Sequence, residues 1–220
     1  MQSFMRELLN ESIKNSKANL QLSSIFSDNG FKQLCLASGG VPRDFLSLTV
    51  KLLSSYVSEN NTVSKIDVTE VAISNFSNKL DAYAKDSAEE KQVLDLYLSY
   101  LKSFLLSERK TNMFLLPNQE IEDYPQINQA IKELTDLRMI HLVEPITSSA
   151  PSDGKKYSAY MIDIGLYPNS KPRNFNQIEP GLSDDKSRKD QIRSAPKLNL
   201  LELNGKVNEK STQLELELTP

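Results

Sequence analysis

The chain has 220 residues, a formal net charge of −3 and a sequence pI near 5.4, with 39% hydrophobic and 25% charged residues. This composition is ordinary for a soluble protein of one large or two small domains, and it excludes a global basic field for nucleic acid. The single cysteine, Cys35, excludes an internal disulfide, and His141 has no His or Cys neighbour that would complete a zinc site. No apolar run approaches the roughly 20 residues of a membrane span. The N-terminal pattern is not that of a signal peptide, so we predict a cytoplasmic protein with no membrane partner.

The N-terminal part of the chain has the apolar spacing of amphipathic helices. The predicted helices cover residues 2–16, 30–36, 42–56 and 65 to about 84. Asp67 and Glu70 have the spacing of a capping box at the start of the last helix. The chain therefore begins inside a helical element, which is compatible with a fragment of a longer protein or with an atypical start.

The connection before the helix 42–56 reads Gly-Gly-Val-Pro-Arg-Asp over residues 39–44. Two glycines permit a tight turn, and Pro42 suits the first position of a helix, where a missing N–H costs nothing. Asp44 lies in the first turn, where the helix dipole favours a carboxylate. Arg43 is left at the mouth of the helix, which is a suitable place for a phosphate. A plain helix cap with a solvated arginine is the alternative interpretation.

The run Gly-Gly-Val-Pro-Arg-Asp-Phe-Leu at residues 39–46 resembles the sensor-2 motif in the helical lid of AAA+ ATPases. It is most similar to the initiator type, the relatives of origin-recognition proteins. The resemblance implies that Arg43 reaches the γ-phosphate of an ATP molecule that a separate P-loop domain holds. The entry into the helix that begins at residue 65 also resembles such a lid. The resemblance therefore covers residues 1–84, which we predict to be a lid-like helical domain.

The segment that follows has the element order of a winged helix. A capping box at residues 87–90 precedes a long helical face. The later predictions are a strand at 113–116, a short helix within 118–124, a helix from 125 to 137, a strand at 140–143, a loop over 144–156 and a strand at 157–164. Residues 126–144 resemble the third helix and first wing strand of many winged helices. We therefore predict a winged-helix domain over residues 87–167, and this is also the domain order of the initiator family.

The character of the chain changes after Tyr167. Prolines among Asn, Ser, Asp and Lys make residues 168–198 read as a linker. Residues 198–203 precede Asn204-Gly205, a hairpin signal, and residues 214–218 alternate with period two. We predict that residues 168–220 are a linker and flexible tail with two short strand-like pieces. The fold class as a whole is mainly α, with an α+β winged helix after the helical lid.

The chain has neither a G-x-x-x-x-G-K-[ST] phosphate loop nor an apolar strand ending in Asp-Glu. Phosphoryl transfer needs a phosphate cradle, a lysine and a Mg²⁺ site. We therefore expect no ATP hydrolysis by these residues alone. The lid resemblance implies that ATP and its Mg²⁺ are bound by an ATPase core in cis or in trans, outside this chain.

The exposed positions of the third winged-helix helix and of the wing are the candidates for contact with double-stranded DNA or with a protein partner. They are Gln126, Asn128, Gln129, Lys132, Arg138, Lys155 and Lys156. Asn and Gln can read base edges, whereas Glu133 and Asp136 on the same helix repel phosphate. Basic residues of the predicted linker add only a little positive charge, because aspartates lie among them. Both a DNA-binding and a protein-binding or structural winged helix therefore stay open.

The sequence leads to two hypotheses. In the first, the chain is the C-terminal nucleotide-sensing and DNA- or partner-binding portion of an initiator-like AAA+ ATPase, which can form a homo-oligomer. In the second, it is a stand-alone winged-helix DNA-binding or protein-interaction module without nucleotide. A lid separated from its core should expose an apolar patch at Phe4, Leu8 or Leu9, whereas a self-contained module should bury these side chains.

Overall fold

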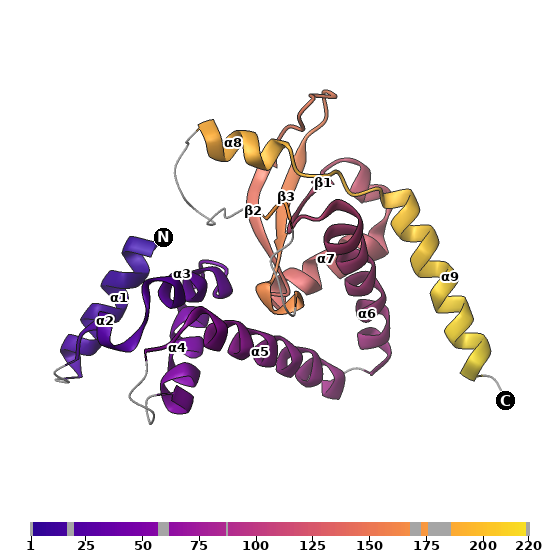
Figure 1. The fold of residues 1–220 in the computed structure, drawn as a ribbon. Coiled ribbons are helices and arrows are strands. Elements are labelled where there is room, and N and C mark those ends of the chain that lie inside the picture. The colour runs from indigo at the N-terminus through magenta and orange to yellow at the C-terminus, as the bar shows by residue number, and fades with distance from the viewer. Residues whose placement is uncertain are drawn as a thin grey trace. The chain divides into compact units, whose positions relative to one another are not determined.

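The computed structural model describes residues 2–16, 20–56, 62–86, 88–167, 173–175 and 186–218 (Figure 1). The described chain divides into two compact units. The first holds the described residues up to 77 together with residues 163–167, and the second holds the described residues of 78–162 and of 169 onward. The chain is mainly helical with one small antiparallel sheet, which confirms the predicted class at that level.

The first unit is a group of helices around an aromatic core. Its elements are α1 (Gln2–Asn15), α2 (Leu22–Ile25), α3 (Asp28–Ala37), α4 (Pro42–Tyr56), the first half of α5 (Lys65–Asp86) and a 3-10 turn (Ile164–Leu166). Phe31 is buried on α3 and meets Phe26 and Phe45 edge to face, with ring centroids 6.4 and 6.0 Å apart. Such aromatic pairs are favoured beyond the area that they bury. The predicted helices of this half are confirmed, with α2 as an additional short turn.

The start of α5 is capped one turn earlier than the sequence suggests. The Ser64 hydroxyl accepts from the N–H groups of Ile66 and Asp67 at 3.2 and 3.4 Å, and the Asp67 carboxylate accepts from Ser64 N at 2.6 Å. The capping box is therefore Ser64 with Asp67, and the predicted pair of Asp67 with Glu70 is wrong. Ser64 provides the short hydroxyl that suits the position before the helix. The other predicted box includes Ser87, which lies outside the described residues.

The second unit is built on three antiparallel strands in the order β1-β3-β2. The strands are β1 (Met113–Pro117), β2 (Ile140–Thr147) and β3 (Tyr157–Ile162). Leu115 lies opposite Ala159 in the β1–β3 register, and β2 pairs with β3 through two irregular steps. Every residue of β1 is buried. A strand buried on both faces needs cover on both sides.

The two faces of the sheet have different cores. Met113 and Leu115 of β1 join Ile192 and Ala195 of the C-terminal segment in one buried cluster. Phe114 alternates to the opposite face, where its ring stacks on Tyr160 at 5.5 Å. The helices of the second unit are α6 (Ala88–Lys102), which continues as a π-helical segment (Ser103–Arg109), a 3-10 turn (Glu120–Asp123), α7 (Pro125–Asp136), α8 (Lys186–Arg193) and α9 (Leu200–Leu218).

The predicted strands of the tail are wrong, because α9 runs through residues 200–218 without a turn at Asn204-Gly205. Leu200, Leu203 and Val207 have helical spacing and are buried where α9 packs on α6. This packing outweighs the period-two pattern, because tertiary burial overrides weak local preference. About half of the predicted linker, residues 168–172 and 176–185, lies outside the described residues. The prediction is wrong for residues 186–193, which form the helix α8 with Ile192 buried against the sheet.

Residues 196–198 close the outer edge of β1. Leu115 N donates to Pro196 O, and Leu198 N donates to Leu115 O, both at 2.8 Å. Lys197 forms a parallel bridge with Leu115. The C-terminal segment thus covers one face of the sheet through α8 and then satisfies the backbone of its edge strand.

Gly165→Ala should destabilise the first unit. A Cβ at Gly165 would lie 2.6 Å from the Phe76 Cβ and 2.8 Å from the Ala72 carbonyl oxygen. We expect the free energy of unfolding to fall by about 1–3 kcal/mol because packed atoms must move. Gly205→Ala is the control, since a Cβ there meets nothing within 4 Å and alanine in a helix should add about 0.5–1 kcal/mol. Urea unfolding followed by circular dichroism measures both, and equal effects would contradict the packing argument.

Candidate functional site

The turn between α3 and α4 has an unusual backbone. Gly39 and Gly40 have φ values of +56° and +79°, which glycine adopts without the steric cost that a Cβ brings. Gly39 N donates to Leu36 O, and Val41 N donates to Ser38 O, both at 3.0 Å. The glycines thus end α3 in a left-handed cap and bring the chain directly into the first turn of α4.

Arg43 lies at the start of α4 with its side chain exposed. The first helical hydrogen bond of α4 runs from Phe45 N to Val41 O at 3.0 Å, so the Arg43 N–H precedes the helical ladder. Within the described part of the chain, no acidic side chain forms an ion pair with Arg43. A guanidinium next to the positive end of a helix is a favourable arrangement for an anionic oxygen.

The first unit also has an apolar groove of about 690 Å³ between α1, α2 and α4. Leu9, Ile13, Leu46 and Val50 contribute to its lining, which includes no charged residue among those described. Of the three residues that test the two hypotheses, Phe4 is 53% exposed and Leu9 is buried at 4%, and Leu8 is half-buried. The first helix therefore exposes part of its apolar surface.

The candidate residues on α7 have unequal access to solvent. Gln126, Gln129 and Lys132 are exposed, whereas Asn128 is half-buried. Gln129 Nε2 donates to Glu133 Oε1 at 2.7 Å, and the Tyr83 hydroxyl donates to the other Glu133 oxygen at 3.1 Å. Glu133 is thus held on the surface that would face a phosphate, and the Gln129 amide already donates a hydrogen bond to the Glu133 carboxylate.

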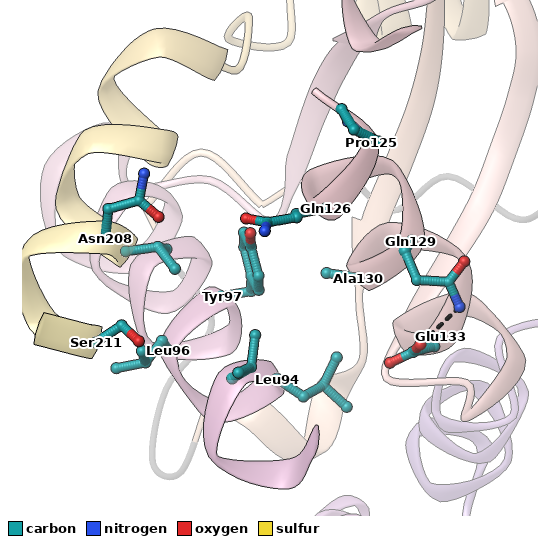
Figure 2. A pocket seen from close by; sticks show the side chains of 12 residues that line it. Leu94, Leu96, Tyr97, Pro125, Gln126, Gln129, Ala130, Glu133, Asn208 and Ser211 are labelled. Atoms are coloured by element: carbon teal, nitrogen blue, oxygen red, sulfur yellow. Dashed lines mark hydrogen bonds between the residues drawn. The ribbon is translucent and has the colours of Figure 1, made fainter. Parts of the chain in front are cut away.

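A cleft of about 560 Å³ lies beside the first half of α7 and is bounded by α6, α7 and α9. Figure 2 shows Gln126 pointing toward Tyr97 of α6, with Asn208 and Ser211 of α9 on the facing wall. The sequence could not indicate this arrangement, because the tail was predicted to be strand-like. The structure thus places α9 across this cleft from α7, the helix that was predicted to contact DNA.

Arg138 lies just after α7 in a left-handed conformation with φ +57°. Arg138 N donates to Thr135 O at 2.9 Å, and Met139 N donates to Leu134 O at 2.8 Å. These two bonds form a Schellman motif, in which the left-handed position is usually glycine. The Arg138 carbonyl also accepts from Lys79 Nζ at 3.2 Å. Arg138 therefore closes the end of α7 with its backbone, in addition to being a candidate contact residue.

Asp153 organises the loop between β2 and β3, which is the predicted wing and is called the wing below. Its carboxylate accepts from Lys197 Nζ at 2.7 Å, from the Tyr157 hydroxyl at 2.5 Å and from Lys155 N at 3.1 Å. These donors, Lys197 foremost, hold the pKa of Asp153 well below its ordinary value of 3.8. Burial raises the pKa of the Tyr157 phenol, and the bond to Asp153 raises it further.

The two wing lysines differ in their surroundings. The Lys155 ammonium forms an ion pair with Glu120 of the 3-10 turn, whereas Lys156 is exposed. The predicted site residues therefore lie in three places: Arg43 on the first unit, and the α7 and wing groups on the second. Sequence reasoning missed Asp153 and Lys197 as partners, because they are 44 positions apart.

No cofactor site is evident within the described ranges. No group of three or more His, Cys, Asp or Glu residues is arranged there to hold a metal ion. The described helices also include none with the length and apolar character to cross a membrane. Among the described residues, no metal site therefore lies beside the Arg43 turn.

Comparison of the chain with models of protein families, with curated proteins and with solved structures gives no match. Function must therefore be argued from the Arg43 turn, the apolar groove and the α7 and wing surfaces.

Arg138→Gly should stabilise the second unit. Glycine removes the left-handed strain, which we expect to raise the free energy of unfolding by about 0.5–1 kcal/mol. Arg138→Ala removes the same charge but keeps a Cβ, so it should bring no such gain. Urea unfolding of both variants tests this, and an equal loss of stability would mean that the guanidinium contributes more than the backbone strain costs.

Asp153→Asn should change how stability depends on pH below 4. Because the folded state lowers the pKa of Asp153, its stabilisation is present above the unfolded value near 4 and is lost as the pH falls through the folded value. The wild-type melting temperature should fall more steeply between pH 4 and pH 2 than that of Asp153→Asn. Asp190→Asn, which removes an exposed carboxylate from α8, should retain the wild-type slope. Parallel slopes for all three proteins would contradict the role of Asp153.

Proposed function

We propose that the chain is the regulatory portion of an initiator-type AAA+ ATPase, in which Arg43 senses the nucleotide. The exposed guanidinium at the start of α4 is the observation that carries the proposal. The first unit would act as the helical lid, and ATP with its Mg²⁺ would be bound by a P-loop core in cis or in trans. The assembly would be cytoplasmic, and the chain itself would not hydrolyse ATP.

Two features of the first unit support this function. The Gly39-Gly40 turn fixes where α4 begins, so Arg43 is presented on a rigid helix. The uncharged groove and the exposed Phe4 offer an apolar surface of the kind that packs against another protein body. A self-contained module would be expected to bury the apolar groove and the Phe4 side chain.

The second unit supports a winged helix as the output domain. The observed order is α6, β1, short turn, α7, β2, loop and β3, with the strand order β1-β3-β2. This order agrees with the one that the sequence hypothesis expects of a winged helix. In the usual mode, the third helix enters the major groove and the wing contacts phosphates. Gln126, Asn128, Gln129, Lys132 and Arg138 would then act on α7 and after it, with Lys155 and Lys156 on the wing.

A stand-alone protein-interaction module is the second candidate. Glu133 is held beside Gln129 on α7, and Lys155 is paired with Glu120, so the surface for the usual DNA mode has little free positive charge. A protein partner would tolerate this balance better than a phosphate backbone. In this case Arg43 would be a helix-cap residue, and no nucleotide would be involved.

Arg43→Ala tests the nucleotide-sensing role. The native protein should be recovered from its cells with its partners, as wild type and as Arg43→Ala, and ATP turnover should be measured on both assemblies. We expect turnover to fall about tenfold or more, because an arginine on the γ-phosphate stabilises the charge of the transition state.

Lys32→Ala is the matched control, since Lys32 is exposed on α3 of the same unit. It should leave turnover unchanged. If Arg43→Ala has the turnover and ATP affinity of the wild type, or if the recovered assembly contains no P-loop polypeptide, the nucleotide-sensing role is wrong and the interaction module is favoured.

A further inference from the structure

Basic side chains are frequent in the wing, in α8 and directly after α8. They are Lys155, Lys156, Lys186, Arg188, Lys189, Arg193 and Lys197, and we call them the α8–wing surface. Four acidic residues lie among them: Glu120, Glu144, Asp153 and Asp190. This surface is therefore net positive on a chain whose formal charge is −3.

The two parts of this surface are joined by direct bonds. Ala150 N of the wing donates to Arg193 O at 2.8 Å, and Lys197 Nζ donates to Asp153 of the wing at 2.7 Å. Figure 1 shows α8 crossing the strands near the end from which the β2–β3 loop projects. These bonds place the C-terminal end of α8 and Lys197 beside the wing.

α8 is fixed to the sheet at both ends of its length. Arg188 pairs with Glu144 at 3.2 Å and donates to Val143 O at 3.2 Å. Ile192 is 1% exposed within the buried cluster beneath the helix. A basic helix that is held in this way can present its lysines without first being ordered by a ligand.

The α7 surface has the opposite charge. From residue 122 to the end of the α7 cap, the acidic residues Glu122, Asp123, Glu133 and Asp136 outnumber Lys132 and Arg138. A B-form major groove about 12 Å wide admits one helix. Because α9 stands across the cleft from Gln126, α7 would have to bring a second helix toward the groove.

We propose that the α8–wing surface, and not α7, contacts the phosphate backbone of a nucleic-acid duplex. The inference rests on the winged-helix part of the proposed function and is independent of nucleotide sensing by Arg43. Binding to a single strand usually requires aromatic side chains for base stacking. Tyr157, the aromatic residue that directly follows the wing at the start of β3, is buried, so this surface offers charge without an aromatic side chain for stacking.

The number of basic side chains that can contact phosphates sets the expected affinity for nucleic acid. Lys155, Arg188 and Lys197 each have an acidic partner, and Lys189 also has an interaction of its own. Lys156, Lys186 and Arg193 are therefore the side chains that we count toward phosphate contacts. Non-specific binding of this kind has dissociation constants of about 10⁻⁴–10⁻⁶ M and weakens with salt by a log–log slope of about −0.9 per phosphate contact. We expect a slope of about −3 and no sequence preference.

The experiment is fluorescence anisotropy of the full chain with labelled DNA and RNA duplexes of the same length over a range of salt concentrations. Lys156→Glu with Lys186→Glu reverses two exposed charges of the α8–wing surface. It should weaken binding about tenfold or more at low salt and reduce the slope by about 2. Lys132→Glu reverses a charge on α7 and should weaken binding less than twofold.

Lys32→Glu with Lys65→Glu is the matched control, since both lysines are exposed on the first unit. It should bind as the wild type does, and circular dichroism should show that all variants fold. If Lys132→Glu abolishes binding while the α8–wing variant retains it, the inference is wrong and the α7 mode of the proposed function stands.

Three other results would overturn the inference. They are preference for single strands, binding to mixed phosphatidylserine and phosphatidylcholine vesicles but to neither duplex, and no binding to any of these. The last would also remove the DNA part of the proposed function, whereas the Arg43→Ala measurement judges the nucleotide part separately. Binding to both duplexes would support contact with the phosphate backbone, and binding to DNA alone would restrict it to the B form.

Discussion

The second unit depends on burying both faces of one short strand. Every residue of β1 is buried, so the sheet must be covered from two sides. Ile192 of α8 belongs to the core of one face, and the Phe114–Tyr160 stack belongs to the other. The C-terminal segment is therefore an integral part of this unit. Without α8, the apolar face made by Met113 and Leu115 would be open to water, at a cost of about 25 cal/mol for each Å² exposed.

Charge is distributed locally in this protein, and its net value of −3 conceals this. Arg43 stands at a helix start with no described acidic partner, whereas the wing and α8 hold several bases among ion pairs with Glu120, Glu144 and Asp153. The first unit thus presents Arg43 without a described acidic partner, whereas the basic residues of the second unit include several that are paired with acids.

Strong helical periodicity made most elements before the predicted linker predictable. Residues 42–56 and 125–136 repeat apolar side chains at the helical period, and the observed helices have nearly the predicted limits. The tail was mispredicted because Asn204-Gly205 and residues 214–218 have local β signals, whereas burial of Leu203 on α6 decides the fold.

The candidate site was predictable only where its residues are close together in the sequence. The glycine turn before Arg43 was predictable because two adjacent glycines favour a backbone with positive φ, which other residues rarely adopt. The pairing of Lys155 with Glu120, which are 35 positions apart, leaves no local pattern. The left-handed Arg138 is also invisible to spacing, since arginine is not the residue expected there.

The bonding of residues 196–198 to β1 has a consequence for self-association. An open edge strand is a template on which another chain can add a strand and begin to aggregate. Here Pro196 O and Leu198 N occupy the β1 edge, and the opposite edge strand, β2, contains Pro145, which lacks the N–H needed for such pairing. Both borders of the sheet are thereby protected against strand addition. Contacts between copies of this chain, or with other proteins, are left to side chains on its helices and loops.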